Sequence, residues 1–90
     1  MKYYIEMTDL FGGEMNYSYV SRYQVESKSI RGAISKLARE VGLNFRIYLD
    51  GGYDAIYHST SKLTGVSIEE TDNEELAWRQ EHTSGTITTL

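Results

Sequence analysis

The sequence predicts an α+β fold: a small single domain in which an antiparallel sheet of about four to five strands, in the order ββαβββ, packs against one amphipathic helix. Two observations predict it. Several segments alternate apolar and polar residues, as half-buried strands do, and one segment repeats apolar residues at spacings of three and four, as a helix with one buried face does. A chain of 90 residues has material for one core, so we expect residues 1–82 to form one domain.

The first two strands are expected to form a hairpin. Residues 2–8 alternate, and residues 17–27 alternate again after the loop FGGE. The adjacent Gly12 and Gly13 suit a tight connection, because glycine adopts positive φ at no steric cost. One face of the second strand would carry a row of rings, from Tyr17, Tyr19 and Tyr23. This row would serve either as core wall or as a contact surface.

The most regular helical pattern lies between residues 30 and 41, where the apolar residues share one face and most of the charged residues lie elsewhere. Ser27 or Ser29 can cap its first turn by accepting a backbone N–H. Gly42 stands where a left-handed residue would end the helix. We therefore expect one helix face to cover the sheet and the other to be basic and exposed.

The second half of the chain adds further strands. NFRIYLD (44–50) and YDAIYHS (53–59) alternate on either side of a DGG turn, which predicts a second hairpin. TGVSIEE (64–70) follows with the same alternation and supplies the last strand of the expected sheet.

The end of the chain predicts a short helix and then a segment without a pattern. Thr71 or Asp72 can cap a short helix that reaches to about residue 82, with Glu74 and Glu75 in its first turn, where the helix dipole favours them. Residues 83–90 show no periodicity, so we expect a flexible tail there.

Charge is distributed unevenly along the chain, which carries a net charge of −4. Residues 1–63 hold eight Lys/Arg and seven Asp/Glu, whereas residues 64–90 hold one and six. A nucleic-acid-binding domain of this size usually has a net positive charge, which makes nucleic acid the less favoured partner. The acidic end is either a solvated segment or a surface that meets a basic protein.

The absence of cysteine and the hydropathy of the chain indicate the cellular compartment in which the protein is expected. The chain has no cysteine, which is compatible with a reducing compartment. No stretch is apolar over the length of a signal peptide or a membrane span. We therefore expect a cytoplasmic protein that does not cross a membrane.

No catalytic or metal site is predicted. His58 and His82 are far apart in the sequence, and without cysteine they would need carboxylates to complete a zinc site. Four carboxylates flank glycine-containing turns: Asp9, Glu14, Asp50 and Asp54. They would form a cation site or an acid–base pair only if those turns met, and carboxylates at turns usually bond to their own backbone. We expect neither enzymatic activity nor a cofactor.

The stretch DLFGGEMNYSYVSRY (9–23), followed by SKSIRGAISKLAREVG (27–42) and GGYDAIYH (51–58), resembles a family of small uncharacterised proteins encoded by bacteriophages and other mobile elements. The recurring pattern of that family is D-x-F-G-G-E-x-N-Y-x-W-V-x-R-Y, then R-G-A on a helix. Tyr19 stands where the family favours tryptophan, and the similarity covers roughly residues 3–70. The resemblance implies a genomic context and no mechanism.

Small phage proteins without catalytic residues are often accessory factors that disable a host component. By analogy, the resemblance implies a non-enzymatic protein that binds a host protein in the bacterial cytoplasm, as an anti-defence inhibitor of the anti-CRISPR or anti-restriction type. The expected contact surface combines the FGGE loop, exposed tyrosines and the acidic end. Its residues are Phe11, Glu14, Asn16, Tyr17, Tyr19, Glu69, Glu70, Asp72, Glu74 and Glu75.

The alternative is a nucleic-acid-binding accessory protein that uses a basic strip on and beside the helix, with Tyr48 or Tyr53 as a stacking face. The strip consists of Lys28, Arg31, Lys36, Arg39 and Arg46. A solvated helix face is the simpler explanation of these charges.

Overall fold

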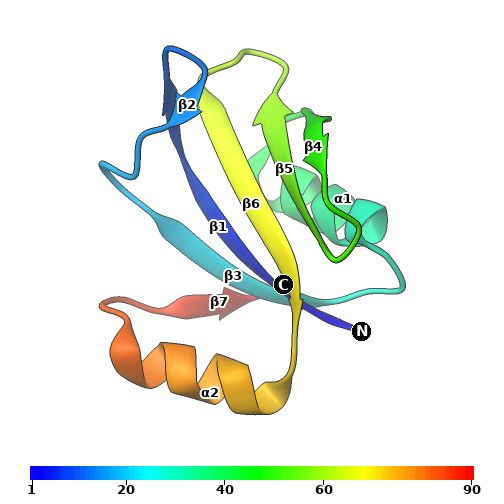
Figure 1. Ribbon diagram of the computed structural model, residues 1–90, viewed down its shortest axis with the longest axis vertical. Coiled ribbons are helices and arrows are strands. Elements are labelled where there is room, and N and C mark those ends of the chain that lie inside the picture. The colour runs from blue at the N-terminus through cyan, green and yellow to red at the C-terminus, as the bar shows by residue number, and fades with distance from the viewer.

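A computed structural model describes residues 1–90 as one sheet with a helix against each of its faces (Figure 1). The elements in chain order are β1 (Lys2–Phe11), β2 (Glu14–Met15), β3 (Ser21–Glu26), α1 (Ile30–Val41), β4 (Phe45–Asp50), β5 (Asp54–Ser59), β6 (Thr64–Thr71), α2 (Asn73–His82) and β7 (Ile87–Thr89). The sheet order is β4-β5-β6-β1-β3-β7, and β2 pairs with β1 off this path. The predicted α+β class with a mostly antiparallel sheet is confirmed.

The long strand β1 lies in the middle of the sheet, antiparallel to β6 on one side and to β3 on the other. Its alternation puts Tyr3, Ile5 and Met7 toward α1, as the sequence predicts. Tyr4 and Thr8 point to the opposite face and are also buried. Because both edges of β1 are paired, this strand holds the two halves of the sheet together.

The main core lies between the sheet and α1. Ala33, Ile34 and Leu37 of the helix pack against eight buried residues of β1, β3, β5 and β6. Ile5 and Leu37 are fully buried there, and truncating such a side chain to alanine typically costs about 2–5 kcal/mol of stability.

Both ends of α1 use the expected residues. The Ser29 Oγ accepts from the backbone N–H of Gly32 at 3.1 Å. Gly42 ends the helix with φ of 70°, and its N–H donates to the carbonyl of Ala38. Because a β-carbon at Gly32 would lie 2.4 Å from the Ser27 Oγ, glycine at that position also fits the close approach of the preceding loop.

The short helix α2 is confirmed. Asp72 caps it, with Oδ1 accepting from the N–H of Glu75 at 2.8 Å. Leu76 is its one buried residue and forms a second small cluster with Tyr4 and Ile87, on the face of the sheet opposite α1. Trp78 remains 58% exposed.

The expected row of tyrosines on a second strand is wrong. Gly12 and Gly13 form the turn of the first hairpin with positive φ, as predicted, but the strand that follows ends at Met15. Tyr17 adopts a φ of 54°, which breaks the extended chain, and β3 begins only at Ser21. Tyr17 and Tyr19 therefore lie on a loop, while Tyr23 packs against the main core.

The number of strands is also larger than expected: seven in place of four to five. One addition is the two-residue β2. The other is β7, which lies within residues 83–90, the segment expected to be a flexible tail. β7 runs parallel to β3, and Ile87 is only 5% exposed. A three-residue strand that returns after a helix shows no periodicity of its own, so the sequence pattern did not reveal it.

The edge strand β4 is irregular. Its pairing with β5 shifts register between Ile47 and Leu49, which is a β-bulge at Tyr48. The ring of Tyr48 stacks on that of His58 with centroids 4.0 Å apart.

We expect Ile87→Ala to lower the free energy of unfolding by about 1–3 kcal/mol, because it opens a cavity between Tyr4 and Leu76. Thr88→Ala, on the exposed side of the same strand, should change it by less than about 0.5 kcal/mol. Urea denaturation followed by circular dichroism measures both. Equal stability of the two variants would show that the end of the chain does not pack on the domain.

Candidate functional site

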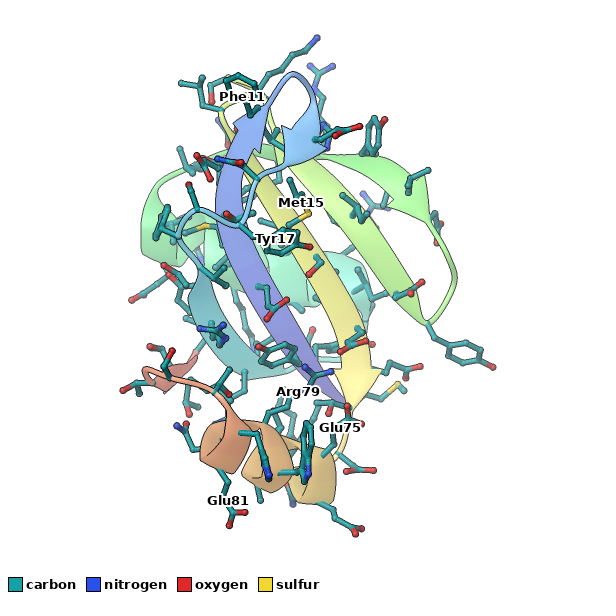
Figure 2. All side chains as sticks on the ribbon, turned by 60° about the vertical axis from the view of Figure 1, so that its left-hand side comes forward. Phe11, Met15, Tyr17, Glu75, Arg79 and Glu81 are labelled. Atoms are coloured by element: carbon teal, nitrogen blue, oxygen red, sulfur yellow. The ribbon has the colours of Figure 1, made fainter.

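One part of the sheet carries no covering element. α1 lies on one face, whereas α2 covers only one end of the other, through Tyr4, Leu76 and Ile87. Figure 2 shows this second face, with Phe11 at one end, Arg79 and Glu75 at the other, and Met15 and Tyr17 between them. We call the uncovered middle of this face, over β1, β5 and β6, the open face.

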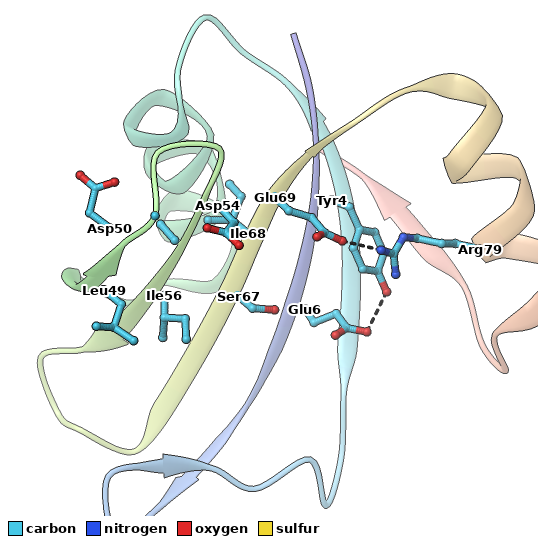
Figure 3. Close-up of a pocket in the computed structure, with 12 residues that line it drawn as sticks. Tyr4, Glu6, Leu49, Asp50, Asp54, Ile56, Ser67, Ile68, Glu69 and Arg79 are labelled. Carbon is cyan, nitrogen blue, oxygen red and sulfur yellow. Dashed lines mark hydrogen bonds and ion pairs between the residues drawn. The ribbon is translucent and has the colours of Figure 1, made fainter.

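A groove of about 600 Å³ lies on the open face beside α2 (Figure 3). The main side chains that line it are Tyr4, Glu6, Leu49, Asp54, Ile56 and Glu69, and Arg79 reaches it from α2. It therefore combines two apolar side chains with several carboxylates and one guanidinium.

Strand register places these side chains together. Ile56 of β5 pairs with Ser67 of β6 and with Leu49 of β4. Asp54 stands directly opposite Glu69, so two carboxylates are neighbours across the strands. Successive side chains alternate between faces, and these residues all point away from α1.

Arg79 connects α2 to the groove. Its guanidinium carbon lies 4.2 Å from the centre of the Tyr4 ring. Its Nη2 donates to Glu69 Oε1 and, at 3.1 Å, to Glu75 Oε1 one turn earlier in the helix. One cation thus compensates two carboxylates and stacks on an aromatic ring.

Tyr4 forms the buried end of the groove. Its hydroxyl donates to Glu6 Oε2 at 2.9 Å, and Glu6 Oε2 also lies 3.6 Å from Arg22 Nε. Burial, together with this hydrogen bond, raises the pKa of Tyr4 to about 12. The phenol therefore stays neutral at physiological pH.

Asp50 and Asp54 differ in their surroundings. Asp50 Oδ1 accepts from the N–H of Gly52 at 3.0 Å, which is the local role expected of a turn carboxylate. The carboxylate of Asp54 has no ion pair and no side-chain hydrogen bond. It is the free carboxylate of the groove.

Of the predicted loop residues, Phe11 lies at the end of the molecule far from α2, whereas Tyr17 lies about halfway between Phe11 and Arg79 (Figure 2). Phe11 is 79% exposed, and Tyr17 and Tyr19 are about half exposed. Asn16 is structural, since its Nδ2 donates to Asp9 Oδ2 at 3.2 Å. Hydrogen bonds from Asn16 and then from Ser18 lower the pKa of Asp9, which holds this loop. Glu14 is exposed beside the turn.

The predicted acidic residues are divided. Glu69 lies in the groove, whereas Glu70 lies near α1, beside Tyr3 and Arg31. Asp72 caps α2, and Glu75 pairs with Arg79. Glu74 is exposed in the first turn of α2, together with Glu75. The expected surface is therefore not continuous: Phe11 lies at the end far from α2, three of the acidic residues lie at the start of α2, and Glu69 alone of the predicted residues lines the groove.

The predicted basic strip is also divided. Lys28, Arg31, Lys36 and Arg39 are exposed on and just before α1, and Lys36 Nζ donates to the carbonyl of Glu26 at 2.6 Å. Arg46 pairs with His58 on the face of the sheet that points away from α1. The helix and β4 thus do not share one basic surface.

The sequence did not single out Tyr4 or Arg79, which form the closed end of the groove with Glu69. They are distant in sequence, and only the return of α2 over β1 brings them together. Of the four turn carboxylates, Asp9 and Glu14 lie at one end of the sheet and Asp50 and Asp54 at the β4–β5 turn. No group of three His, Cys, Asp or Glu residues is arranged to hold a metal ion.

Comparison with known proteins identifies no relative: no family model, no curated protein and no solved structure matches this chain. Neither helix has the length and apolar character needed to cross a membrane.

We expect Arg79→Leu to lower the free energy of unfolding by about 1–2 kcal/mol, because it removes two ion pairs and a cation–π contact and leaves Glu69 facing Asp54. The matched control is Arg39→Leu on the exposed face of α1, where the arginine has no ion pair. Its effect should stay within about 0.5 kcal/mol. Chemical denaturation measures both; equal losses would mean that the Arg79 contacts add nothing.

We expect the Tyr4 hydroxyl to ionise at a higher pH than an ordinary tyrosine. A phenol with a folded pKa of about 12 and an ordinary unfolded value near 10 adds stability that is complete below pH ~10 and is lost as the pH rises toward ~12. We expect Tyr4→Phe to remove one tyrosinate step centred near pH 12 from the ultraviolet absorbance titration. A Tyr4 step near the ordinary value would contradict the burial and the bond to Glu6.

Proposed function

We propose that this chain is a non-enzymatic module that binds another protein with the open face of its sheet. The observation that carries the proposal is the groove: a cavity of about 600 Å³ on a sheet face that α2 covers at one end only. Apolar side chains beside a polar rim, left uncovered on a small domain, are typical of interaction surfaces.

Exposed rings and aliphatic side chains border the groove. Tyr48 is 58% exposed, and Leu49 beside it is 56% exposed. Tyr17 adds a half-exposed ring on the same face, about halfway between Phe11 and Arg79 (Figure 2). Tyrosine suits such a surface, because it buries a large ring at small entropic cost and keeps a hydroxyl for hydrogen bonding at the rim.

The non-enzymatic part of the proposal is supported by how the groove's polar groups are engaged. Arg79 is shared between two carboxylates, and Glu6 accepts from Tyr4. The raised pKa makes Tyr4 a poor source of tyrosinate at neutral pH. These contacts fix α2 to β1 and β6 and prepare no nucleophile.

For the partner, we propose a host protein of the bacterium in which a phage or mobile element carries this gene, with components of restriction or CRISPR defence as the first class to test. The support is the DxFGGExNY resemblance and the analogy with other small accessory proteins.

A second candidate, binding of nucleic acid by α1, is favoured by one observation. Lys28, Arg31, Lys36 and Arg39 gather on and just before the exposed side of the helix, and none of them forms an ion pair. The net charge of −4 and the position of Arg46 on the other face weaken this candidate.

The experiment is affinity capture of bacterial lysate on the tagged protein at low salt and at about 0.5 M salt, where exposed charge contacts are screened. We expect a defined host protein to survive high salt and to be reduced at least about tenfold by the double variant Tyr48→Ala, Leu49→Ser. Both side chains are exposed, so the fold should persist by circular dichroism.

The matched control is the α1 double variant Arg31→Gln, Arg39→Gln, which should retain the same host protein. If that control alone abolishes capture, and what is lost is nucleic acid that washes off with salt, the second candidate replaces the first. If both variants capture the same material as the original chain, the open face is not the binding surface.

A further inference from the structure

The pairing of β5 with β6 contains a local conflict. Asp54 and Glu69 stand directly opposite each other on the same face of the antiparallel pair. Like charges in this position are destabilising, since their β-carbons are only about 5 Å apart. Natural proteins keep such unfavourable local pairings mainly at functional or strained sites.

The protein's own cations relieve this conflict only in part. Arg79 reaches Glu69, but the same Nη2 also serves Glu75. Asp54 receives no cation at all. The groove therefore has carboxylate charge in excess, located between β5 and β6.

The other groove carboxylates are already engaged. Glu6 accepts from the Tyr4 hydroxyl and faces Arg22, and Asp50 accepts from the backbone of the turn. The carboxylate without a cationic partner is thus Asp54, and its cross-strand neighbour Glu69 shares Arg79 with Glu75. Figure 3 shows Glu69 bonded to Arg79 and Asp54 without a partner.

Apolar surface adjoins this charge. Ile56 follows Asp54 on the same face of β5, and Leu49 pairs with Ile56 from β4. A ligand that fits both features has a cationic head on an aliphatic stem, which describes the side chains of arginine and lysine. A small hydrated cation would leave the apolar walls unused.

We propose that the groove takes a basic side chain from a short Arg- or Lys-bearing segment of the partner protein, with its head at Asp54 and Glu69 and its stem over Ile56 and Leu49. The inference rests on the proposed function, that the open face binds a protein, and adds the chemistry of the segment that enters it. Arginine is the better match, because its planar fork can meet two carboxylates at once.

The test uses two synthetic octapeptides of alternating arginine and alanine, blocked at both ends, in which the second replaces arginine by citrulline. Citrulline keeps the shape of arginine and removes its charge. We expect the arginine peptide to shift the backbone amide signals of β5 and β6 around Asp54 and Glu69 in a two-dimensional NMR titration, and the citrulline peptide to leave them unchanged.

Asp54→Asn should weaken binding of the arginine peptide about tenfold, the effect of losing one charge-assisted contact. The matched control is Glu40→Gln, which makes the same charge change at an exposed, unpaired residue of α1 and should leave the affinity unchanged. Asp54→Asn should also raise the melting temperature of the free protein, because it ends the like-charge pairing. A purely structural aspartate would instead lower it.

Equal binding of the two peptides, no binding of the arginine peptide, or equal weakening by Asp54→Asn and Glu40→Gln would each overturn the inference. The last outcome would mean that only the overall negative charge attracts the peptide. If the peptide test fails while capture of a host protein still depends on Tyr48 and Leu49, the proposed function stands and the basic segment is rejected. If capture also loses that dependence, both are rejected.

Discussion

The central position of β1 is the constraint on which the rest of this structure depends. Residues 2–9 of this strand pair with β6 and residues 2–7 pair with β3, and side chains of the strand are buried toward both faces. Ile5 anchors the core under α1, whereas Tyr4, one residue earlier, anchors the contacts with α2. A shift of one residue in register would exchange these faces and put Glu6 into the core. The groove exists because the two faces of this strand are covered unequally.

Tyr4 and Arg79 link stability to the candidate site. The Tyr4 ring packs against the Arg79 guanidinium, and the guanidinium binds the carboxylate of Glu69, which strand register places opposite Asp54. The groove is therefore built on the same contacts that fix α2 to the sheet. Such coupling preorganises the proposed binding surface, since its charged residues are already held in the free protein.

Local patterns sufficed to predict most of the fold but only part of the site. Alternation located β1, β4, β5 and β6, and residues at both ends of α1 were predicted because caps are local interactions. Tyr17 and Tyr19 were misplaced because Asp9 holds Asn16 and Ser18 across the loop, a contact that no period reveals. β7 was missed for a similar reason: Ile87 acquires its role only when the chain returns beside β3. The groove joins residues from β1, β5, β6 and α2, so only tertiary structure could bring Asp54 to Glu69 and Arg79 to Tyr4.

The bulge at Tyr48 has a consequence for how this protein behaves among copies of itself. β4 forms one margin of the sheet, and three consecutive residues there, Ile47, Tyr48 and Leu49, are more than half exposed. A flat strand with this composition would be a template for edge-to-edge aggregation. The bulge interrupts the regular spacing of the backbone groups along that margin, which a pairing strand would need. The chain can thus expose an apolar strand margin while the same strand resists pairing with further copies into fibrils.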